Sequence, residues 1–339
     1  MLIIFLFFFI SIFCYFIIPD KSTNANTIDL TIKSKKPGFK KMFFENTSVS
    51  NTPYTLFFGN DKRNEEYALD DFEIINDSTI KIINYDKLRK SVVDEKTILI
   101  KSGSNLHSNV QNIEKFIKEK KFIFGTDIYG RDLFSRILLG VRVSLSIGLM
   151  AVLISNMIGI TLGLISGYYG GFIDKIIVTI INIFWSIPTL LLVIAFSVAI
   201  GKGFWQVYIA IGLSIWVDVA RLVRGKVISE KNKDYIFASR VLGYNDLRIL
   251  LRNILPNILS PILIFSAANF SSSILLESGL SFLGIGSQPP TPSWGYMIKE
   301  NYQYIIFGNS YLIVIPSFFL ISLVLSFYYL SNYFASKKL

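Results

Sequence analysis

The chain has almost no cysteine or histidine, two side chains that proteins often use for zinc binding and for nucleophilic or acid–base catalysis. Its 339 residues include one cysteine, Cys14, and one histidine, His107. A disulfide within the chain is therefore impossible, and a zinc site would lack the three or four converging ligands that it usually needs. A serine or cysteine nucleophile would have no histidine beside it to act as its base. We therefore expect a protein that is not an enzyme, with no catalytic residues, no metal site and no cofactor.

Charged residues are scarce as well. They make up 17% of the chain, against about 25% in soluble domains, while 52% of the residues are hydrophobic. The sequence contains no Gly-x-x-x-x-Gly-Lys-Ser/Thr loop, so the chain is not expected to bind ATP itself. The net charge of +10 could suggest a nucleic-acid partner, but the basic excess lies in short loops between apolar runs. That distribution is typical of membrane orientation, and nucleic-acid binding is not expected.

What the sequence does have is a set of long apolar runs. A helix needs about 20 apolar residues to cross roughly 30 Å of hydrocarbon. Gly148, Gly159 and Gly163 lie on the second run, where small residues let membrane helices approach closely, and Pro188 interrupts the third. The first run could be a cleavable signal peptide, but without a basic flank or a small-residue cleavage site an uncleaved span is favoured. The sequence predicts about six spans in the lipid bilayer, at residues 2–18, 143–165, 176–199, 204–222, 258–280 and 311–335.

Residues 20–122 differ in kind, because they are rich in Lys, Asn, Asp, Ser and Thr. Alternating segments at 72–83 and 97–100 are typical of short strands, and 112–121 could form a short amphipathic helix. We therefore expect an all-α membrane protein with a small insert of mixed or β character. Its parts are the first span at 1–19, the insert at 20–122 and a core with five spans at 123–339.

The polar stretch at 221–256 holds eight basic and three acidic side chains. By the positive-inside rule this stretch is cytoplasmic. Counting spans from it places both chain termini inside and the insert outside, in agreement with the basic tail at Lys337 and Lys338. Arg131, Arg136 and Arg142 then fall on the outer side, against the simple rule, and an amphipathic outer segment would accommodate them.

The same stretch predicts two short helices. Gly243 suits the left-handed position that ends the first helix, Asn245 can cap the second, and Pro256 fits the first turn of a third. A helix pair that is joined rigidly to two spans could transmit motion. The alternative is an ordinary solvated loop, which would not need apolar side chains such as Ile236 and Val241.

This stretch resembles the Glu-Ala-Ala loop of ABC-importer permeases. The family pattern runs to a glycine, then nine or ten residues, then Ile-x-Leu-Pro or a close variant. Ala238, Gly243 and the segment 254–256 match it, whereas Phe237 and Ser239 stand where the family often has Glu and Ala. The departure argues against a salt bridge at Phe237 but leaves the helix pair intact.

Other segments are similar to the peptide/nickel-type permeases, and most closely to the second permease of the oligopeptide and dipeptide systems. The long insert, the residues after Lys175 and the tail depart from the family pattern. The resemblance covers roughly residues 124–300. The matching segments are Gly125–Asp132 with Ser135 and Arg136, Gly140–Leu145, Gly167–Asp174, Glu277–Gly286 and Pro289–Gly295.

The resemblance implies a type I ABC importer transmembrane bundle in the bacterial inner membrane. It also implies a second permease subunit, two cytoplasmic ATP-binding subunits and an extracytoplasmic solute-binding protein. Peptides are the implied solute, with nickel chelates as the alternative. The coupling loop at 224–256 would dock on an ATPase subunit. The docking residues would be Asp234, Tyr235, Ala238, Ser239, Arg240, Gly243, Leu255 and Pro256.

Polar residues also form stripes inside two predicted spans. Ser266, Asn269, Ser273 and Glu277 are spaced to share one helix face. Because polar groups in a span usually face a protein interior or water, this stripe could line a translocation path, or it could serve helix packing. On the fourth span we expect a structural ion pair between Asp218 and Arg221.

Two other classes of protein remain possible from the sequence. One is a secondary transporter or channel that works without ATPase subunits. The other is an anchored extracytoplasmic protein whose insert carries the function.

Overall fold

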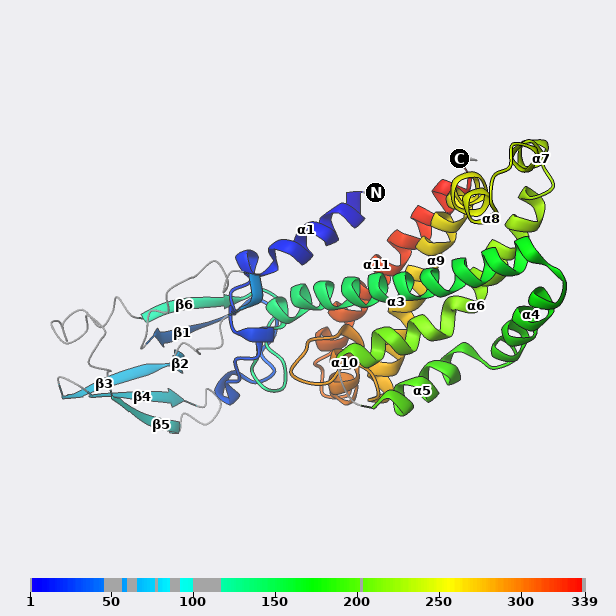
Figure 1. Cartoon of the computed structure of the whole chain (residues 1–339). Coiled ribbons are helices and arrows are strands. Elements are labelled where there is room, and N and C mark those ends of the chain that lie inside the picture. Colours follow the sequence, from blue (N-terminus) through cyan, green and yellow to red (C-terminus); the bar gives the residue numbers. More distant parts are fainter. Residues whose placement is uncertain are drawn as a thin grey trace. The chain divides into compact units, whose positions relative to one another are not determined.

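The structure is a computed structural model that describes residues 2–45, 57–59, 66–76, 79–85, 92–99, 117–201 and 204–336. His107, residues 112–116, the connection at 202–203 and the basic tail at 337–339 lie outside this part of the chain. The chain divides into two compact units (Figure 1), which are described separately. The first unit consists of Phe9–Arg142 and Glu300–Pro316, and the second of Met1–Phe8, Val143–Lys299 and Ser317–Leu339.

Two antiparallel sheets build most of the first unit, as the strand-like segments of the insert predict. The strands of one sheet lie in the order β2-β1-β6 and those of the other in the order β3-β4-β5. Their inward positions are apolar, and Phe44, Leu69, Ile80, Ile82 and Ile98 form a shared buried cluster. The strands are β1 Phe39–Glu45, β2 Glu66–Leu69, β3 Asp71–Asn76, β4 Thr79–Tyr85, β5 Val92–Leu99 and β6 Ile117–Phe122.

The prediction of a helix at 112–121 is wrong for residues 117–121, which are the part of this range that the structure describes. Residues 117–122 form the edge strand β6, which pairs with β1 from Phe44 opposite Ile117 to Phe39 opposite Phe122. This pairing gives the backbone groups of β6 hydrogen-bond partners on one side. A short, mostly charged helix at these positions would bury too little apolar surface to be stabilised as well as the paired strand. Lysines on β6 also keep the exposed edge polar, which discourages pairing with another chain.

The outer arginines are held by acidic and carbonyl groups of the first unit. Arg131 donates from Nε to Asp127 (2.6 Å) and from Nη2 to Glu300 (2.7 Å); Arg131 and Asp127 are buried, and Glu300 is partly buried. Arg136 is also buried, with its Nε 3.7 Å from the same Asp127 carboxylate. Arg142 donates to the carbonyl of Phe57 at 2.6 Å. These partners explain why three arginines can precede the second span without setting its orientation.

The second unit is a bundle of apolar helices. Four helices in the described chain are long and apolar enough to cross a membrane, and a bent pair adds a fifth span. The shorter apolar helix α1 (Leu2–Ile17) corresponds to the first predicted span. The expected membrane protein of about six spans with a small β insert is therefore confirmed. The other helices are α3 Leu133–Tyr169, α4 Gly171–Trp185, α5 Thr189–Ile200, α6 Phe204–Glu230, α9 Leu255–Leu283 and α11 Tyr311–Ser336.

The third predicted span is a broken helix rather than a continuous one. The axes of α4 and α5 differ by 93°, and residues 186–188 between them are not helical. Pro188 has no amide proton to donate, and a proline disfavours the helical conformation of the residue before it. The break therefore lies where the local sequence is least able to continue a helix.

The glycines of α3 allow the close approach to α6 that their spacing predicts. A Cβ placed on Gly163 would lie 2.7 Å from the Cβ of Val223, closer than two side-chain carbons can approach. The same arrangement repeats one turn before and one turn after. The pairs are Gly159 with Val219, Gly163 with Val223 and Gly167 with Val227, and together they form what we call the glycine–valine seam.

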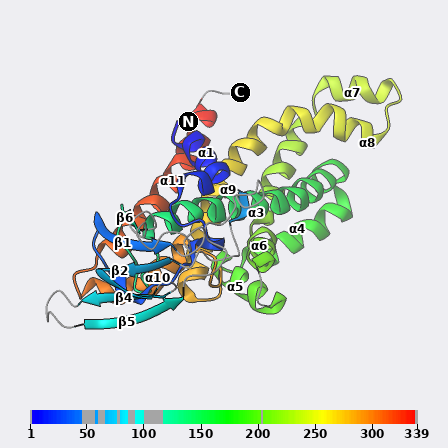
Figure 2. The same ribbon diagram turned by 90° about the vertical axis from the view of Figure 1, so that its left-hand side faces the viewer.

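Figures 1 and 2 show two different ends of the helical unit. The helices α7 (Asp234–Val241) and α8 (Asp246–Arg248) lie at one end, and α10 (Trp294–Asn301) lies at the other. Gln206, near the start of α6, donates to the carbonyl of Ile285 at 3.0 Å and so belongs to the α10 end. The sequence predicts residues 225–252 inside and residues 281–305 outside, and the position of the two segments at different ends of the helical unit agrees with that topology.

Candidate functional site

The helix α7 ends in the way that the sequence predicts. Gly243 adopts φ +74°, the left-handed conformation that side chains other than glycine rarely adopt. The amide of Tyr244 donates to the carbonyl of Ser239 (3.1 Å) and the amide of Gly243 to that of Arg240 (2.9 Å). These two bonds define a Schellman motif, which satisfies carbonyls that would otherwise be unpaired at the helix end. The turn between α7 and α8 is therefore fixed by backbone geometry.

The next helix begins as expected from its cap. The side chain of Asn245 accepts a hydrogen bond from the amide of Arg248 at 2.9 Å. A π-helical segment, Ile249–Ile254, then joins α8 to α9, and Pro256 lies in the first turn of α9. The structure differs from the expectation in that α8, this segment and α9 run on as one helix rather than two.

One side of α7 packs against the bundle. Ile236 is fully buried, and Ser239 is 5% exposed. The Ser239 hydroxyl donates to the carbonyl of Tyr235 (2.8 Å) and accepts from Nδ2 of Asn253 (2.7 Å). Leu255 packs against the same apolar cluster. The residues of that cluster come from α3, α6, α7 and the helix that follows, and include Leu164, Val223, Val227, Ile236, Ile249, Ile254 and Ile258.

Ser239 therefore does not lie on the open docking surface where the sequence places it, and Tyr235 is only partly exposed. The Tyr235 hydroxyl donates to Glu230 (2.6 Å) and accepts from Asn257 (3.0 Å). Burial, and then the hydrogen bond to Glu230, raise the pKa of Tyr235 to about 12. Tyr235 is thus a neutral donor that ties α7 to the end of α6. The sequence alone could not show this, because the identity of the buried side depends on the neighbouring helices.

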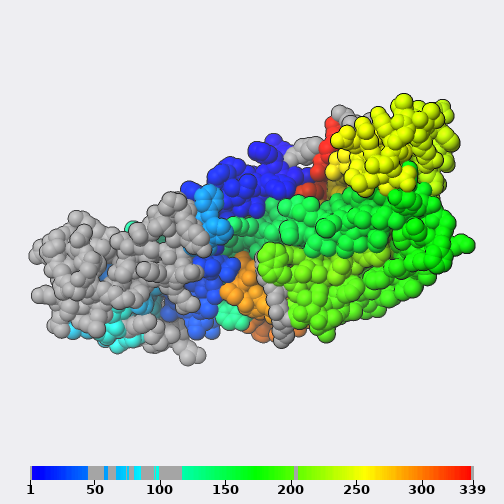
Figure 3. All heavy atoms as spheres, viewed as in Figure 1, coloured from blue at the N-terminus to red at the C-terminus, as the bar shows by residue number. Residues whose placement is uncertain are grey.

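The opposite side of α7 and the start of α8 carry large apolar side chains that nothing in the described chain covers. Phe237 is 58% exposed, Val241 88%, Leu242 71% and Leu247 65%. Ala238 is exposed among them. We call this set the apolar coupling face. Figure 3 shows the segment, in yellow, at the surface of the molecule. The sequence predicts a role for Ala238 and for the apolar Val241 and Leu242, but it did not indicate that Phe237 and Leu247 belong to the same surface.

Polar contacts hold this face firmly on the bundle. Tyr168, near the end of α3, donates to Asp246 at 2.7 Å, and the guanidinium of Arg240 lies 5.6 Å from the centre of the Tyr168 ring. Lys231 donates to the carbonyl of Gly167 at 2.9 Å. Asp234, exposed in the first turn of α7, favours that helix through the helix dipole. The helix pair is therefore a stiff extension of α3 and α6.

The polar stripe on α9 faces the interior of the chain. Ser266 accepts from Nδ2 of Asn156 on α3 at 2.8 Å. Asn269 is 8% exposed, and Ser273, which is fully buried, donates to the Asn269 carbonyl at 2.7 Å. These contacts favour a role in helix packing, rather than in lining the translocation path, for Ser273. For Ser266 and Asn269, a role in lining the translocation path stays a prediction.

Glu277 lies at the centre of a group of hydroxyls and has no exposed surface. Its Oε1 accepts from Ser281 (2.7 Å), Ser293 (2.6 Å) and Ser287 (3.2 Å). Ser287 and Ser293 belong to the segment before α10. Glu277 therefore ties the α10 end to α9. The sequence predicts an ordered outer segment at 281–300, because three prolines restrict its backbone, with Trp294 as an interfacial anchor. The contacts of Glu277 agree with an ordered segment, but Trp294 is fully buried against the rings of Phe7 and Phe319, so its prediction as an interfacial anchor is wrong.

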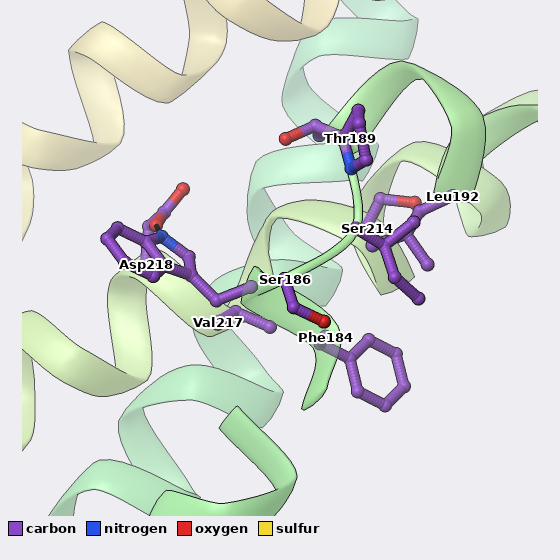
Figure 4. A pocket seen from close by; sticks show the side chains of 10 residues that line it. Phe184, Ser186, Thr189, Leu192, Ser214, Val217 and Asp218 are labelled. Carbon is purple, nitrogen blue, oxygen red and sulfur yellow. Dashed lines mark hydrogen bonds between the residues drawn. The ribbon is translucent and has the colours of Figure 1, made fainter. Parts of the chain in front are cut away.

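A cavity of about 300 Å³ opens at the break between α4 and α5. Ser186, Pro188 and Thr189 line it from the break, and Ser214 and Asp218 line it from α6. Figure 4 shows Ser186, Thr189 and Asp218 around the segment that joins the two helices. Pro188 and the charges inside the fourth span were the sequence signals for this site, but only the broken helix brings them together.

The ion pair expected between Asp218 and Arg221 does not form among the described side chains. Trp185 lies between them instead: its Nε1 donates to Asp218 Oδ1 at 3.2 Å, and the Arg221 guanidinium lies 3.9 Å from the centre of its ring. Arg221 also donates to Asn182 at 3.2 Å. The two charges thus stay separate, one in the cavity and one on the outer face of Trp185.

Comparison with known proteins gives consistent matches. Residues 159–338 match the family described as "Binding-protein-dependent transport system inner membrane component". The chain is 41% identical over 197 residues to the dipeptide transport system permease protein DppC of Bacillus subtilis, covering 58% of this chain and 62% of that protein. It is 41% identical over 206 residues to DppC of Haemophilus influenzae, covering 61% and 70%.

A third relative is the glutathione transport system permease protein GsiD of Pectobacterium atrosepticum, 41% identical over 203 residues, with 60% of this chain and 67% of that protein covered. The matches thus span about two thirds of the length of these relatives. Among solved structures, an inward-facing MetNI methionine ABC transporter aligns with a TM-score of 0.49 at 20% identity, covering 59% of this chain and 94% of that chain.

Proposed function

Because this chain belongs to the family of binding-protein-dependent transport system inner membrane components, we propose that it is one permease subunit of an ATP-driven importer. It is a multi-pass protein of the bacterial inner membrane, with the helical bundle of type I importers. In the proposed complex it forms half of the translocation path, beside a second permease subunit. Two cytoplasmic ATP-binding subunits supply the work, and an extracytoplasmic solute-binding protein delivers the solute.

The proposed solute is a peptide or a similar small molecule. This part of the proposal is supported by the relatives, which are named for the transport of dipeptides and of glutathione. Nickel chelates remain the alternative that uptake competition would test.

The apolar coupling face is the observation that supports docking of an ATPase subunit. A chain without a phosphate-binding loop must receive work through contact. Leu242 and Leu247 are mostly exposed at the α7–α8 end, where the helix pair is tied to α3 and α6. Full burial of one such leucine against a partner contributes about 1.5–3 kcal/mol. The exposed guanidinium of Arg240, at the rim of the face, would pair with a partner carboxylate while it stays against the Tyr168 ring.

The experiment compares Leu242→Ser and Leu247→Ser with Leu30→Ser. Leu30 is 63% exposed in the other unit, so its replacement changes surface polarity equally without touching the coupling face. We expect the first two variants to insert normally and to lose co-purification of the ATPase subunits and ATP-dependent uptake of dialanine by about tenfold. Leu30→Ser should behave as the wild type. Normal co-purification and uptake in both coupling-face variants would refute docking at this face.

Two rival functions make different predictions. A stand-alone secondary transporter would keep its uptake after ATP depletion and would follow an ion gradient. An anchored extracytoplasmic protein would lose its activity when residues 20–122 are deleted and would be indifferent to changes at Gly243. Uptake in ATP-depleted and ATP-loaded proteoliposomes therefore separates the three functions.

A further inference from the structure

We propose that the cavity at the break between α4 and α5 contacts the transported solute and takes its ammonium group at Asp218. The inference deepens the proposed function, on which it rests, by assigning the solute contact to a surface other than the polar stripe on α9. It follows from where the cavity lies, from what surrounds it and from the chemistry of its lining.

The cavity lies at the depth of the membrane-spanning part of α6. Asp218 is 14 residues after Phe204, the first residue of α6, which places it about 21 Å along the helix axis. The joining segment 185–191 is exposed along its whole length. Backbone that is not helical is tolerated at this depth only when it is buried in protein or lines water, because lipid offers no hydrogen bonds. This surface therefore faces a partner or a water-filled path, and not lipid.

The exposed surface of α11 provides the contrast. Phe318 is 66% exposed, Ile321 53% and Leu325 45%, and these residues follow one another at helical spacing. An apolar stripe of this kind is what lipid-facing helices present. The α4–α6 side also exposes apolar side chains, such as Ile183 and Leu191, but there they are accompanied by the polar Asn182 and the charged Arg221. Ionisable groups inside a span usually mark a solute or ion pathway.

The lining of the cavity favours a cation over an anion. Asp218 is partly exposed and carries the one acidic side chain among the lining residues. The Trp185 indole satisfies one of its oxygens, Oδ1. The guanidinium of Arg221 contacts Trp185 and Asn182, and among the described side chains it forms no ion pair with Asp218.

The helix ends at the break do not oppose this preference. The carboxyl end of α4 and the amino end of α5 both line the cavity, so their partial negative and positive charges offset each other. The hydroxyls of Ser186, Thr189 and Ser214 supply further oxygen acceptors. A primary ammonium group has three donors and suits such a set of oxygens. The chemical class that fits is a small solute with a free amino group, such as an unblocked peptide.

The test uses a single cysteine at Thr189 in a chain with Cys14→Ser, assembled in the complete transporter. Its modification rate is measured with trimethylammonioethyl and sulfonatoethyl methanethiosulfonate, which are permanently cationic and anionic. We expect both reagents to react, because the cavity holds water, and the cation to react about fivefold faster because of Asp218. Adding Asp218→Asn should remove that preference. A cysteine at Ile321, on the lipid-facing stripe, is the matched control and should not react.

Dialanine should then slow modification at Thr189, and N-acetylated dialanine, which has no ammonium group, should not. A cysteine at Thr189 that is unreactive in the assembled transporter would overturn the proposal, because lipid or the second permease subunit then covers the cavity. Equal rates for the two reagents, or equal protection by the two peptides, would overturn it as well. ATP-driven uptake is measured on the same samples, so a failure of the importer function is recognised separately from a failure of this site.

Discussion

Replacing Gly243 with valine should separate membrane insertion from ATPase coupling. Gly243 has φ +74°, and nothing lies within 4 Å of a Cβ built on it. The substitution therefore causes no clash inside the chain, and its free-energy cost comes only from strain in the backbone conformation of residue 243. A left-handed conformation costs a side-chain-bearing residue about 1–2 kcal/mol, and a β-branched residue lies at the unfavourable end of that range.

The backbone can escape this cost only by leaving the left-handed region. Doing so breaks the Schellman bonds to the carbonyls of Ser239 and Arg240 and moves the last turn of α7. That turn carries Val241 and Leu242, the most exposed members of the apolar coupling face. If docking requires the native turn, a strain of about 1–2 kcal/mol lowers affinity for the ATPase by about 5- to 30-fold.

The assay is co-purification of the ATPase subunits with the permease, together with ATP-dependent uptake of dialanine in proteoliposomes. Gly243→Asn is the matched control, because asparagine fits the same open space and tolerates the left-handed region better than other side chains. We expect Gly243→Val to reach the membrane at wild-type level with reduced co-purification and uptake, and Gly243→Asn to lie between it and the wild type. Normal co-purification and uptake in Gly243→Val would refute the reasoning.

Three further outcomes are expected. Gly163→Ala should lower the free energy of unfolding of the purified chain by about 1–3 kcal/mol through overpacking against α6. Gly225→Ala should not, because nothing lies within 4 Å of its added carbon. Equal melting temperatures for the two variants would contradict the close contact. Glu277→Gln should lower the free energy of unfolding by about 2 kcal/mol and expose the segment before α10 to proteolysis. Ser272→Ala, on the exposed side of α9, should do neither. Altered uptake with unchanged stability in Glu277→Gln would instead indicate that Glu277 lines the translocation path. A cysteine at Ser229, in an otherwise cysteine-free chain, should be modified only from the cytoplasmic side, and labelling by an outside-only reagent would reverse the topology.

Features that depend on local chemistry were predictable from the sequence. Gly243 ends a helix because few other residues adopt its conformation, and Asn245 caps the next because its side chain reaches an amide three residues on. The spans are predictable for the same reason, since lipid imposes its length and polarity on each one separately. Gly163 was informative because a missing side chain on a membrane helix usually marks a close neighbour.

Features that depend on a distant partner were not predictable. Residues 117–122 became a strand because β1 was available to pair with them. Ser239 turned inward because Asn253, fourteen residues away, meets its hydroxyl. The cavity at Pro188 is a third example, because a proline in a span permits both a mild kink and a 93° break. The packing of α5 against α6, which no local pattern encodes, decides between them.

The glycine–valine seam has a consequence for how the two helices can move. Its contacts are made by backbone atoms and by the β- and γ-carbons of valines, which have one strongly preferred rotamer in a helix. A surface with so little side-chain freedom has few alternative packings, so α3 and α6 should not slide past each other by small steps. Any displacement applied at α7, which follows α6 after a three-residue turn, then becomes a displacement of both helices together. Asp218 lies on α6, so the wall of the cavity that contains it belongs to this same rigid pair. The seam would therefore couple a movement at the ATPase-docking end to the proposed solute site.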